Sequence, residues 1–333
     1  MKICLYDARW LGVHGIGRFA AEVISRLSLR MHELRGPWGP AFPLDPLWVS
    51  WQIAKQQPDV YFSPGYNPPL KSKVPFVFTV HDLNHLDVPD NSSLAKRLYY
   101  NHVIAPACRR AYKVLTVSEY SRQRILEWSG LETDRVINVG NGVGVEFSPN
   151  GEANKPDYSY FLYIGARKKH KNLRNLCIAF SEARLPNTVK LVLSGLPDKE
   201  LVSLGEQLGI GERLVFVGEI SGENLPSYYR GALALVLPSL YEGFGLPIVE
   251  AMACGTAVVT SDRTSMPEVA GDAGYLIDPE SVSSITSALV RVIQNDDERS
   301  MRIRNGLIHV KKFSWAETAK KVEDVLLQAA NAG

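Results

Sequence analysis

The sequence lacks several features by which common classes of protein are identified. It has only four cysteines in 333 residues, widely scattered and without a C-x2-C pair, which argues against a zinc site and against a disulfide framework. Lysine and arginine (37) barely outnumber aspartate and glutamate (35), and the net charge of +2 calls for no nucleic-acid partner.

Long apolar runs are also missing. No segment approaches the ~20 residues that span a bilayer, and a strand-like run at 2–7 leaves no room for a signal peptide. We therefore expect a cytoplasmic protein. No D-x-D triplet occurs, which weakens any role for a divalent metal bridging a diphosphate, and we expect no metal site.

Short β-branched runs alternate with amphipathic stretches of helical length along the whole chain. This pattern is typical of parallel sheets covered by helices and predicts an α/β fold. A polar stretch, 146–157, divides the pattern and is interpreted as a linker. The predicted strands lie near 2–7, 59–63, 75–80, 113–117 and 135–139, and then near 160–165, 189–194, 214–218, 234–237, 257–260 and 275–277.

The two series predict two Rossmann-like domains, 1–150 and 158–312. Residues 313–333 follow the last strand and form a predicted helix, about 314–329, that packs back on the first domain. Within the first domain we predict a helix from about 17 to 29 and another after Ser118, which suits an N-cap.

The first candidate site is the loop Gly12-Val13-His14-Gly15-Ile16-Gly17-Arg18, between the first strand and the first helix. Gly15 and Gly17 let the backbone approach a ligand, and amides at a helix start suit phosphate. The alternative is a tight turn that needs positive φ. The G-x2-G-x-G spacing differs from the dinucleotide-binding fingerprint.

The second candidate is the basic loop that contains Arg167 and Lys171. It lies between a strand expected to end at Gly165 and a helix expected to begin near Asn172. Ligands bind at the carboxyl ends of parallel strands, where these cations would neutralise a diphosphate. The alternative is a solvated basic loop.

The third candidate is the segment 238–255, in which a glycine-rich loop precedes a short helix. Glu242 belongs to the loop and Glu250 to the helix, so the two carboxylates can reach different points of one ligand. The amides of Phe244, Gly245 and Leu246 face the same space. A first-turn glutamate that favours the helix dipole would explain Glu250 alone.

Two weaker candidates lie in the first domain. His81 and Asp82 directly follow the predicted strand 75–80, where they can bind a substrate, although a lone histidine is more often structural. The segment 96–124 carries seven basic residues and one acid. It suits contact with an anionic membrane face, or equally a solvated helix face.

These segments together resemble glycosyltransferase family four, a large group of retaining enzymes with the GT-B fold that includes many bacterial mannosyltransferases. The resemblance is strongest in EGFGLPIVEAMACGTAVVTSD, where Glu242 and Glu250 match the family's pair of glutamates, and in the SMPEVAGDAG run at 265–274. Weaker matches are GIGR at 15–18, VHD at 80–82 and KNL at 171–173. Ala166 and His170 stand where many members have an arginine.

The resemblance implies two Rossmann-like domains facing across a cleft, with the acceptor on domain 1–150 and the nucleotide-sugar donor on domain 158–312. It also implies a metal-independent reaction without a cofactor. Arg167 and Lys171 would hold the donor diphosphate, and Glu250 would bind the ribose. Glu242 and the amides that follow it would hold the transferred sugar, with His81 near its hydroxyls. The backbone around Gly218 and Ile220 would receive the base.

The predicted function is transfer of a hexose, with GDP-mannose as the best guess for the donor, to a glycan or lipid-linked acceptor in bacterial surface-polysaccharide synthesis such as that of lipopolysaccharide. The segment 96–124 would contact the inner face of the membrane. Two alternatives stay open on sequence alone: a nucleotide-sugar epimerase of the same architecture, and a non-catalytic subunit that binds sugar nucleotides.

Overall fold

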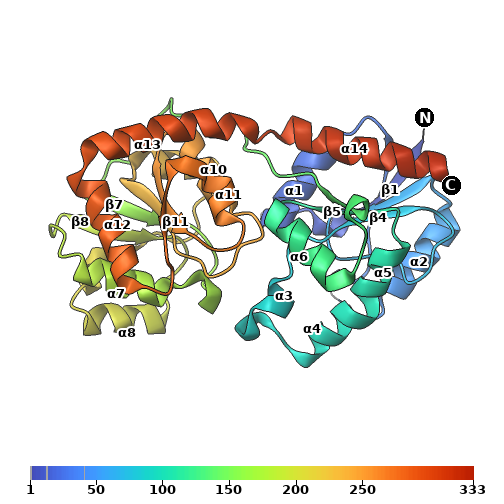
Figure 1. Ribbon diagram of the computed structural model, residues 1–333, viewed down its shortest axis with the longest axis horizontal. Helices are drawn as coiled ribbons and strands as arrows, with labels where there is room; N and C mark the ends of the chain where they lie inside the picture. Colours follow the sequence, from blue (N-terminus) through green and yellow to red (C-terminus); the bar gives the residue numbers. More distant parts are fainter. Residues whose placement is uncertain (1, 13, 41) are drawn as a thin grey trace. The chain divides into compact units, whose positions relative to one another are not determined.

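The computed structural model describes residues 2–12, 14–40 and 42–333, and the chain divides into two compact units (Figure 1). Unit 1 comprises residues 1–142 and 314–333, and unit 2 comprises residues 143–313. Each unit is built on one six-stranded parallel sheet with helices packed against it. The α/β prediction is therefore confirmed.

Unit 1 contains a sheet with the strand order β2-β1-β3-β4-β5-β6, all parallel. Its middle strands are buried on both faces, which explains their continuous apolar sequences. The strands are β1 (Ile3–Asp7), β2 (Arg30–Leu34), β3 (Val60–Ser63), β4 (Phe76–Thr79), β5 (Lys113–Thr116) and β6 (Val136–Asn138). The helices are α1 (Gly15–Ile24), α2 (Asp45–Gln56), α3 (Asn84–Asp87), α4 (Leu94–Tyr99), α5 (Ala105–Arg110), α6 (Glu119–Ser129) and α14 (Trp315–Ala332).

Unit 2 contains a parallel sheet with the strand order β12-β11-β10-β7-β8-β9. Its strands are β7 (Ser159–Tyr163), β8 (Val189–Leu193), β9 (Leu214–Phe216), β10 (Ala234–Leu237), β11 (Ala257–Ser261) and β12 (Gly274–Ile277). Its helices are α7 (Leu173–Glu182), α8 (Lys199–Gln207), α9 (Leu225–Gly231), α10 (Leu246–Ala253), α11 (Met266–Ala270), α12 (Val282–Gln294) and α13 (Asp296–His309).

Two predictions of local structure in unit 1 were wrong. The helix expected over 17–29 ends at Ile24, and the chain then forms β2, which the sequence did not indicate. β2 is an edge strand in which Leu34 is the one buried residue of RMHEL, so it lacks the apolar run that marks the buried strands.

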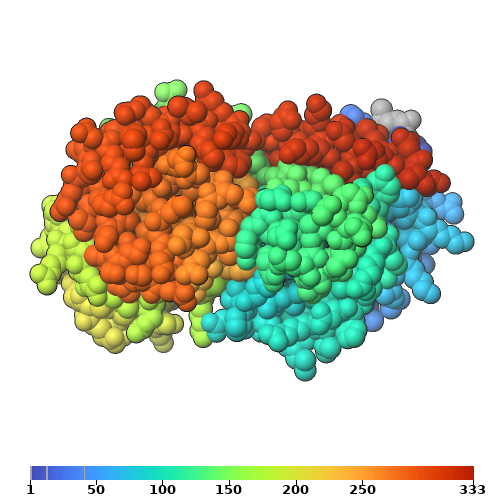
Figure 2. Space-filling model, viewed as in Figure 1, coloured from blue at the N-terminus to red at the C-terminus, as the bar shows by residue number. Residues whose placement is uncertain are grey.

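The last helix, α14, belongs to unit 1, where it packs along α1 and against β3 and β4 (Figure 1). Ser314 caps its start, and Glu323 accepts hydrogen bonds from the amide and hydroxyl of Ser28. Its outer face lies on the surface of this unit, where Figure 2 shows it in red.

The stretch 146–157, interpreted above as a linker, is part of unit 2 and packs on α9. Arg230 of α9 donates hydrogen bonds to the carbonyls of Glu152 (2.8 Å) and Ser148 (3.0 Å), and the amide of Asn154 donates to the carbonyl of Ser227 (2.9 Å). The stretch thus has a fixed path although it has almost no apolar residues.

Candidate functional site

The strand order of unit 2 places its candidate site. β7 is flanked by β8 on one side and by β10 on the other, so the chain reverses its direction of travel across the sheet between β7 and β10. Ligands of open parallel sheets bind outside the carboxyl ends of the strands at such a switch point. The loops that leave β7 and β10 contain Lys171 and Glu242, respectively.

Lys171 and Glu242 meet at this point. Nζ of Lys171 lies 2.6 Å from Oε1 of Glu242, and the hydroxyl of Ser239 donates to the same oxygen at 2.7 Å. The side chains of the pair are 16% and 13% exposed, so both are largely withdrawn from solvent. An ammonium has three N–H donors, and Glu242 uses one of them, which leaves Lys171 able to bind an anion as well.

The backbone of Glu242 is held from a third loop, which follows β11. The amide of Glu242 donates to Oγ1 of Thr264 at 3.2 Å, and the hydroxyl of Ser265 donates to the carbonyl of Glu242 at 2.9 Å. Thr264 has a φ of +57°, a conformation that is strained for a β-branched residue. Sequence reasoning did not assign a role to Thr264, Ser265 or Ser239.

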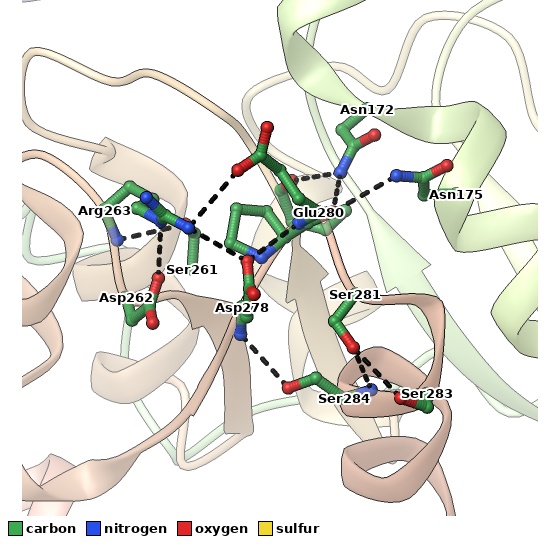
Figure 3. A network of polar contacts seen from close by, with 12 residues as sticks. Asn172, Asn175, Ser261, Asp262, Arg263, Asp278, Glu280, Ser281, Ser283 and Ser284 are labelled. Atoms are coloured by element: carbon green, nitrogen blue, oxygen red, sulfur yellow. Dashed lines mark hydrogen bonds and ion pairs between the residues drawn. The ribbon is translucent and has the colours of Figure 1, made fainter.

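Asn172, the residue after Lys171, connects its own loop to two others, and Figure 3 shows its side-chain amide and the hydrogen bonds it makes. Its Nδ2 donates to the carbonyl of Pro279 at 2.6 Å and to that of Pro238 at 3.1 Å. Asn172 has a φ of +62° and stands directly before α7, so the helix expected near this residue begins at Leu173. Asp278, the residue before Pro279, forms an ion pair with Arg263 at 3.1 Å. The residue next to Lys171 thus ties the loop after β7 to the loops after β10 and β12.

Arg167 turns away from this pair. The strand before it ends at Tyr163 and not at Gly165, and the guanidinium lies against the loop after β8. It donates to the carbonyls of Ser194 (2.9 Å) and Gly195 (2.8 Å), pairs with Asp198 (3.0 Å), and stacks on the ring of Phe216. The structure therefore does not bring Arg167 together with Lys171.

Glu250 lies in α10 and is 4% exposed. The hydroxyl of Tyr229, itself fully buried, donates to Oε2 of Glu250 at 2.7 Å. The backbone carbonyl of Tyr229 in turn accepts a hydrogen bond from Thr256 at 2.6 Å. Tyr229 is a further residue that sequence reasoning missed, because nothing in the local pattern connects it to Glu250.

The segment between the two glutamates forms the start of α10. Gly245 is its N-cap with a φ of +92°, and Leu246 is its first helical residue. The first amides of a helix have no partner within it and favour an anionic or polar ligand. Phe244 is buried, and its ring packs edge-on against Phe313 with centroids 5.7 Å apart.

Gly218 and Ile220 follow β9 at the edge of the same sheet. Gly218 has a φ of +69°, which favours glycine, and its carbonyl accepts a hydrogen bond from the amide of Gly195 at 2.6 Å. Gly218 thus turns the backbone near the loop that Arg167 contacts.

In unit 1, Gly15 and Gly17 lie in the first turn of α1; Val13 of the same loop lies outside the described residues. Nδ1 of His14, the N-cap of α1, accepts a hydrogen bond from the backbone amide of Gly17 at 3.0 Å, so this amide already has a partner. Gly17 does not adopt positive φ. It is needed because a Cβ there would lie 2.3 Å from the carbonyl oxygen of Gly12.

His81 and Asp82 follow β4. Nε2 of His81 lies 2.8 Å from the carbonyl of Pro64, so it carries the proton and leaves Nδ1 as an acceptor. Burial lowers the pKa of His81 from 6.5 to about 4, and the ring is neutral near pH 7. The carboxylate of Asp82 accepts a hydrogen bond from the backbone amide of Asn84 at 3.0 Å, at the start of α3. The hydroxyl of Tyr66 forms hydrogen bonds with the backbone carbonyl and amide of Asp82.

Within the described residues, 2–12, 14–40 and 42–333, no three histidine, cysteine, aspartate or glutamate side chains are grouped so that they could hold a metal ion. Nor does the described part of the chain contain a helix with the length and apolar character needed to cross a bilayer.

Comparison with known proteins gives consistent matches over both units. Residues 10–147 match the family described as Glycosyltransferase Family 4, and residues 145–309 match the family described as Glycosyl transferases group 1. The O-antigen chain mannosyltransferase B of Escherichia coli is 32% identical over 82% of this chain and 75% of its own length. A serotype-specific mannosyltransferase of the same organism is 30% identical over 63% of this chain, but the match covers 28% of that protein.

Among solved structures, HepE of Anabaena in complex with UDP-glucose superimposes with a TM-score of 0.80 over 98% of this chain and 100% of that chain. The two sequences are 17% identical. This likeness concerns the fold.

Proposed function

Because the chain belongs to glycosyltransferase family four and is a retaining hexosyltransferase of the GT-B fold, we propose that it transfers mannose from GDP-mannose to a glycan or lipid-linked acceptor in surface-polysaccharide synthesis. Mannose is chosen because relatives at 32% and 30% identity are mannosyltransferases, and the acceptor class because one of them acts on an O-antigen chain.

The observation that carries the proposal is the pairing of Lys171 with Glu242 at the switch point between β7 and β10. A sugar nucleotide presents a diphosphate and a row of hydroxyls side by side. Lys171 supplies charged hydrogen-bond donors for the diphosphate, and the carboxylate of Glu242 accepts hydrogen bonds from the hydroxyls of the sugar beside it. Glu250 then binds the ribose, and the backbone at Gly218 and Ile220 receives the base.

We expect a reaction in which the enzyme mainly positions and stabilises charge. The leaving diphosphate, stabilised by Lys171 and by the amides at the start of α10, accepts the proton of the attacking hydroxyl on the face from which it departs. Configuration is then retained without an enzyme nucleophile. The contribution of Arg167 is smaller than the sequence suggested, because its donors serve the loop after β8. His81 would accept a hydrogen bond from a substrate hydroxyl through Nδ1.

Contact with the inner, cytoplasmic face of the membrane is a further part of the proposal. In the basic segment 96–124, three of the seven cations form ion pairs within unit 1: Lys113, Arg122 and Arg124. Lys96 and Arg97 lie on α4 beside Leu94 and Leu98, which are 75% and 47% exposed. Exposed leucines next to cations suit an anionic lipid surface.

A thermal-shift screen tests the donor site. Purified protein is heated with GDP, UDP, ADP and their hexose conjugates, and the screen is repeated on Lys171→Ala and on Lys168→Ala, which removes an exposed cation from the same loop. We expect stabilisation by GDP and GDP-mannose, lost in Lys171→Ala and kept in Lys168→Ala. An equal loss in both variants would assign the effect to general charge. Products are then analysed, because an epimerase would return a changed hexose still attached to its nucleotide.

A further inference from the structure

The outer face of α2 is apolar and open to solvent, although its inner face already packs in the core of unit 1. Val49 and Ile53 are buried and belong to that core. On the other side, Leu44, Leu47 and Trp51 are 56%, 53% and 56% exposed, and at 3.6 residues per turn they lie within an arc of about 60°. A surface helix needs one apolar face for its own core, so the second apolar face of α2 indicates a binding surface.

This outer face continues into a groove of about 790 Å³, which we call the α2 groove. Trp51 and Ile53 of α2 form one wall, and the segment 71–74, which precedes β4, forms the other. Arg110, at the end of α5, also lines the α2 groove, because α5 lies beside α2 in unit 1 (Figure 1).

The two walls are tied to each other. The backbone amide of Leu70 donates to the carbonyl of Pro46 at 3.0 Å, and the amide of Lys71 donates to Oγ of Ser50 at 3.1 Å. The hydroxyl of Ser50 donates in turn to the carbonyl of Pro46 at 2.6 Å. The α2 groove is therefore preformed, and a ligand need not order its walls on binding.

The α2 groove lies at the amino ends of the strands of unit 1. Of its lining residues, Gln57 precedes β3, Val74 precedes β4 and Arg110 precedes β5. His81 and Asp82 lie at the opposite, carboxyl end of β4. Since substrates of open parallel sheets bind at the carboxyl ends of the strands, the α2 groove is separate from any substrate site and has another role.

The rim of the α2 groove is positively charged. Lys71, Lys73 and Arg110 are exposed lining residues, and none of the three forms an ion pair within residues 2–12, 14–40 and 42–333. Lys55 adds a fourth cation, with Nζ 5.2 Å from the centroid of the Trp51 ring. The most exposed aromatic ring of the α2 groove thus lies among cations.

The segments that form the α2 groove supply no acid that could neutralise this rim. Residues 42–80 contain two acids: Asp45 is fully buried and pairs with Arg9, and Asp59 pairs with Lys2 at 3.4 Å. Residues 94–118, which include α5, contain none. An apolar groove with a positive rim is complementary to a ligand that has an apolar stripe flanked by carboxylates.

We propose that the α2 groove binds an amphipathic helix of a partner protein, with apolar side chains packed on Trp51 and carboxylates paired with the rim cations. Helices bind in this way to apolar grooves of many proteins. A lipid surface is flat and would leave the hollow between α2 and the segment 71–74 unfilled. A second copy of this chain would place one positive rim against another across a two-fold axis. The proposal concerns a surface outside the candidate donor site and does not depend on which sugar nucleotide is bound.

Fluorescence anisotropy with two labelled peptides tests the proposal on the full chain. The acidic probe is a helical peptide of about 15 residues with leucines spaced three and four apart and glutamate elsewhere, and the basic probe has lysine in place of glutamate. We expect the acidic probe to bind at least about ten-fold more tightly than the basic one. Trp51→Asp, and Lys71→Glu combined with Lys73→Glu, should each weaken this binding by at least about ten-fold. Leu327→Asp and Lys320→Glu, on the exposed face of α14, are the matched controls and should bind as the wild type does.

All of these substitutions are made at exposed residues, so the variants should unfold at the wild-type temperature. Absence of binding by the acidic probe, equal affinity for both probes, or unchanged affinity in Trp51→Asp would each overturn the inference. Two measurements identify the other occupants. Sedimentation with vesicles of phosphatidylethanolamine and phosphatidylglycerol that is lost in Trp51→Asp would assign the surface to a membrane, and a wild-type dimer that becomes a monomer in Trp51→Asp would assign it to a second copy. Either result would overturn the proposed partner helix.

Discussion

Lys171 and Glu242 are 71 residues apart in sequence, yet Nζ of one lies 2.6 Å from Oε1 of the other. Each lies in a loop that follows a strand, Lys171 after β7 and Glu242 after β10, and the strand order of unit 2 reverses between these two strands. The pair puts a cation and a carboxylate side by side in a place that is mostly withdrawn from water, where electrostatic interactions are stronger than at the surface. This geometry gives the charge of Glu242 a measurable influence on both ligand binding and transfer.

We expect Glu242→Gln to separate these two influences. The amide keeps the shape of the side chain but removes its charge, so hexose transfer should fall by roughly 10²–10³-fold. Affinity for GDP should stay the same or increase, since Lys171 no longer shares its charge with a carboxylate. Steady-state kinetics and calorimetric titration with GDP measure the two effects. Glu280→Gln, at a glutamate whose side chain is 71% exposed, is the control and should change neither. Wild-type kcat in Glu242→Gln would remove Glu242 from the mechanism.

Thr264 is expected to act by positioning Glu242. Thr264→Ala removes the hydroxyl that accepts a hydrogen bond from the backbone amide of Glu242. We expect kcat to drop by about ten-fold while the affinity for GDP is unchanged. Thr264→Ser keeps the acceptor and should restore kcat. The comparison of kcat with KM for the two variants distinguishes positioning from general destabilisation. If serine and alanine behave alike, the hydrogen bond has no such role.

Tyr229→Phe should destabilise unit 2 and weaken donor binding together. The substitution leaves the buried Oε2 of Glu250 without its phenolic donor, which costs about 1–3 kcal/mol of unfolding free energy. Urea denaturation measures the loss, and titration with GDP measures the change in affinity. Tyr228→Phe, at the half-buried neighbouring tyrosine, serves as the control. A variant as stable as the wild type would mean that Glu250 obtains an equivalent partner elsewhere.

The sequence predicted the fold class and most strands because the buried strands have continuous apolar sequences. It also indicated that Glu242 lies in a loop and Glu250 in a helix, since Pro247 and Gly255 mark where a short helix can start and stop. β2 could not be predicted in this way, because an exposed edge strand needs no apolar run.

The directions in which side chains point could not be predicted from the sequence. Arg167 and Lys171 belong to one basic loop, and nothing in that loop says that Arg167 turns to Phe216 while Lys171 turns to Glu242. A pocket in unit 1 was missed for a related reason. Its lining residues Trp10, Tyr66 and Tyr99 come from three distant segments, and only the sheet order brings these segments together.

The neutral, buried His81 gives a prediction about pH. Its pKa is about 4 in the folded protein and near 6.5 in the unfolded chain, so between these values the unfolded state binds more protons. Stability from this residue is complete above pH 6.5 and decreases as the pH falls towards 4. Between pH 7 and pH 5 the wild type should therefore lose about 1–2 kcal/mol more unfolding free energy than His81→Gln, whose side-chain amide can still donate to Pro64. Urea denaturation at pH 7, 6 and 5 measures the difference. His102→Gln, at an exposed histidine, should keep the wild-type slope. Identical slopes in the wild type and His81→Gln would show that the imidazole becomes protonated in the folded state as easily as in water.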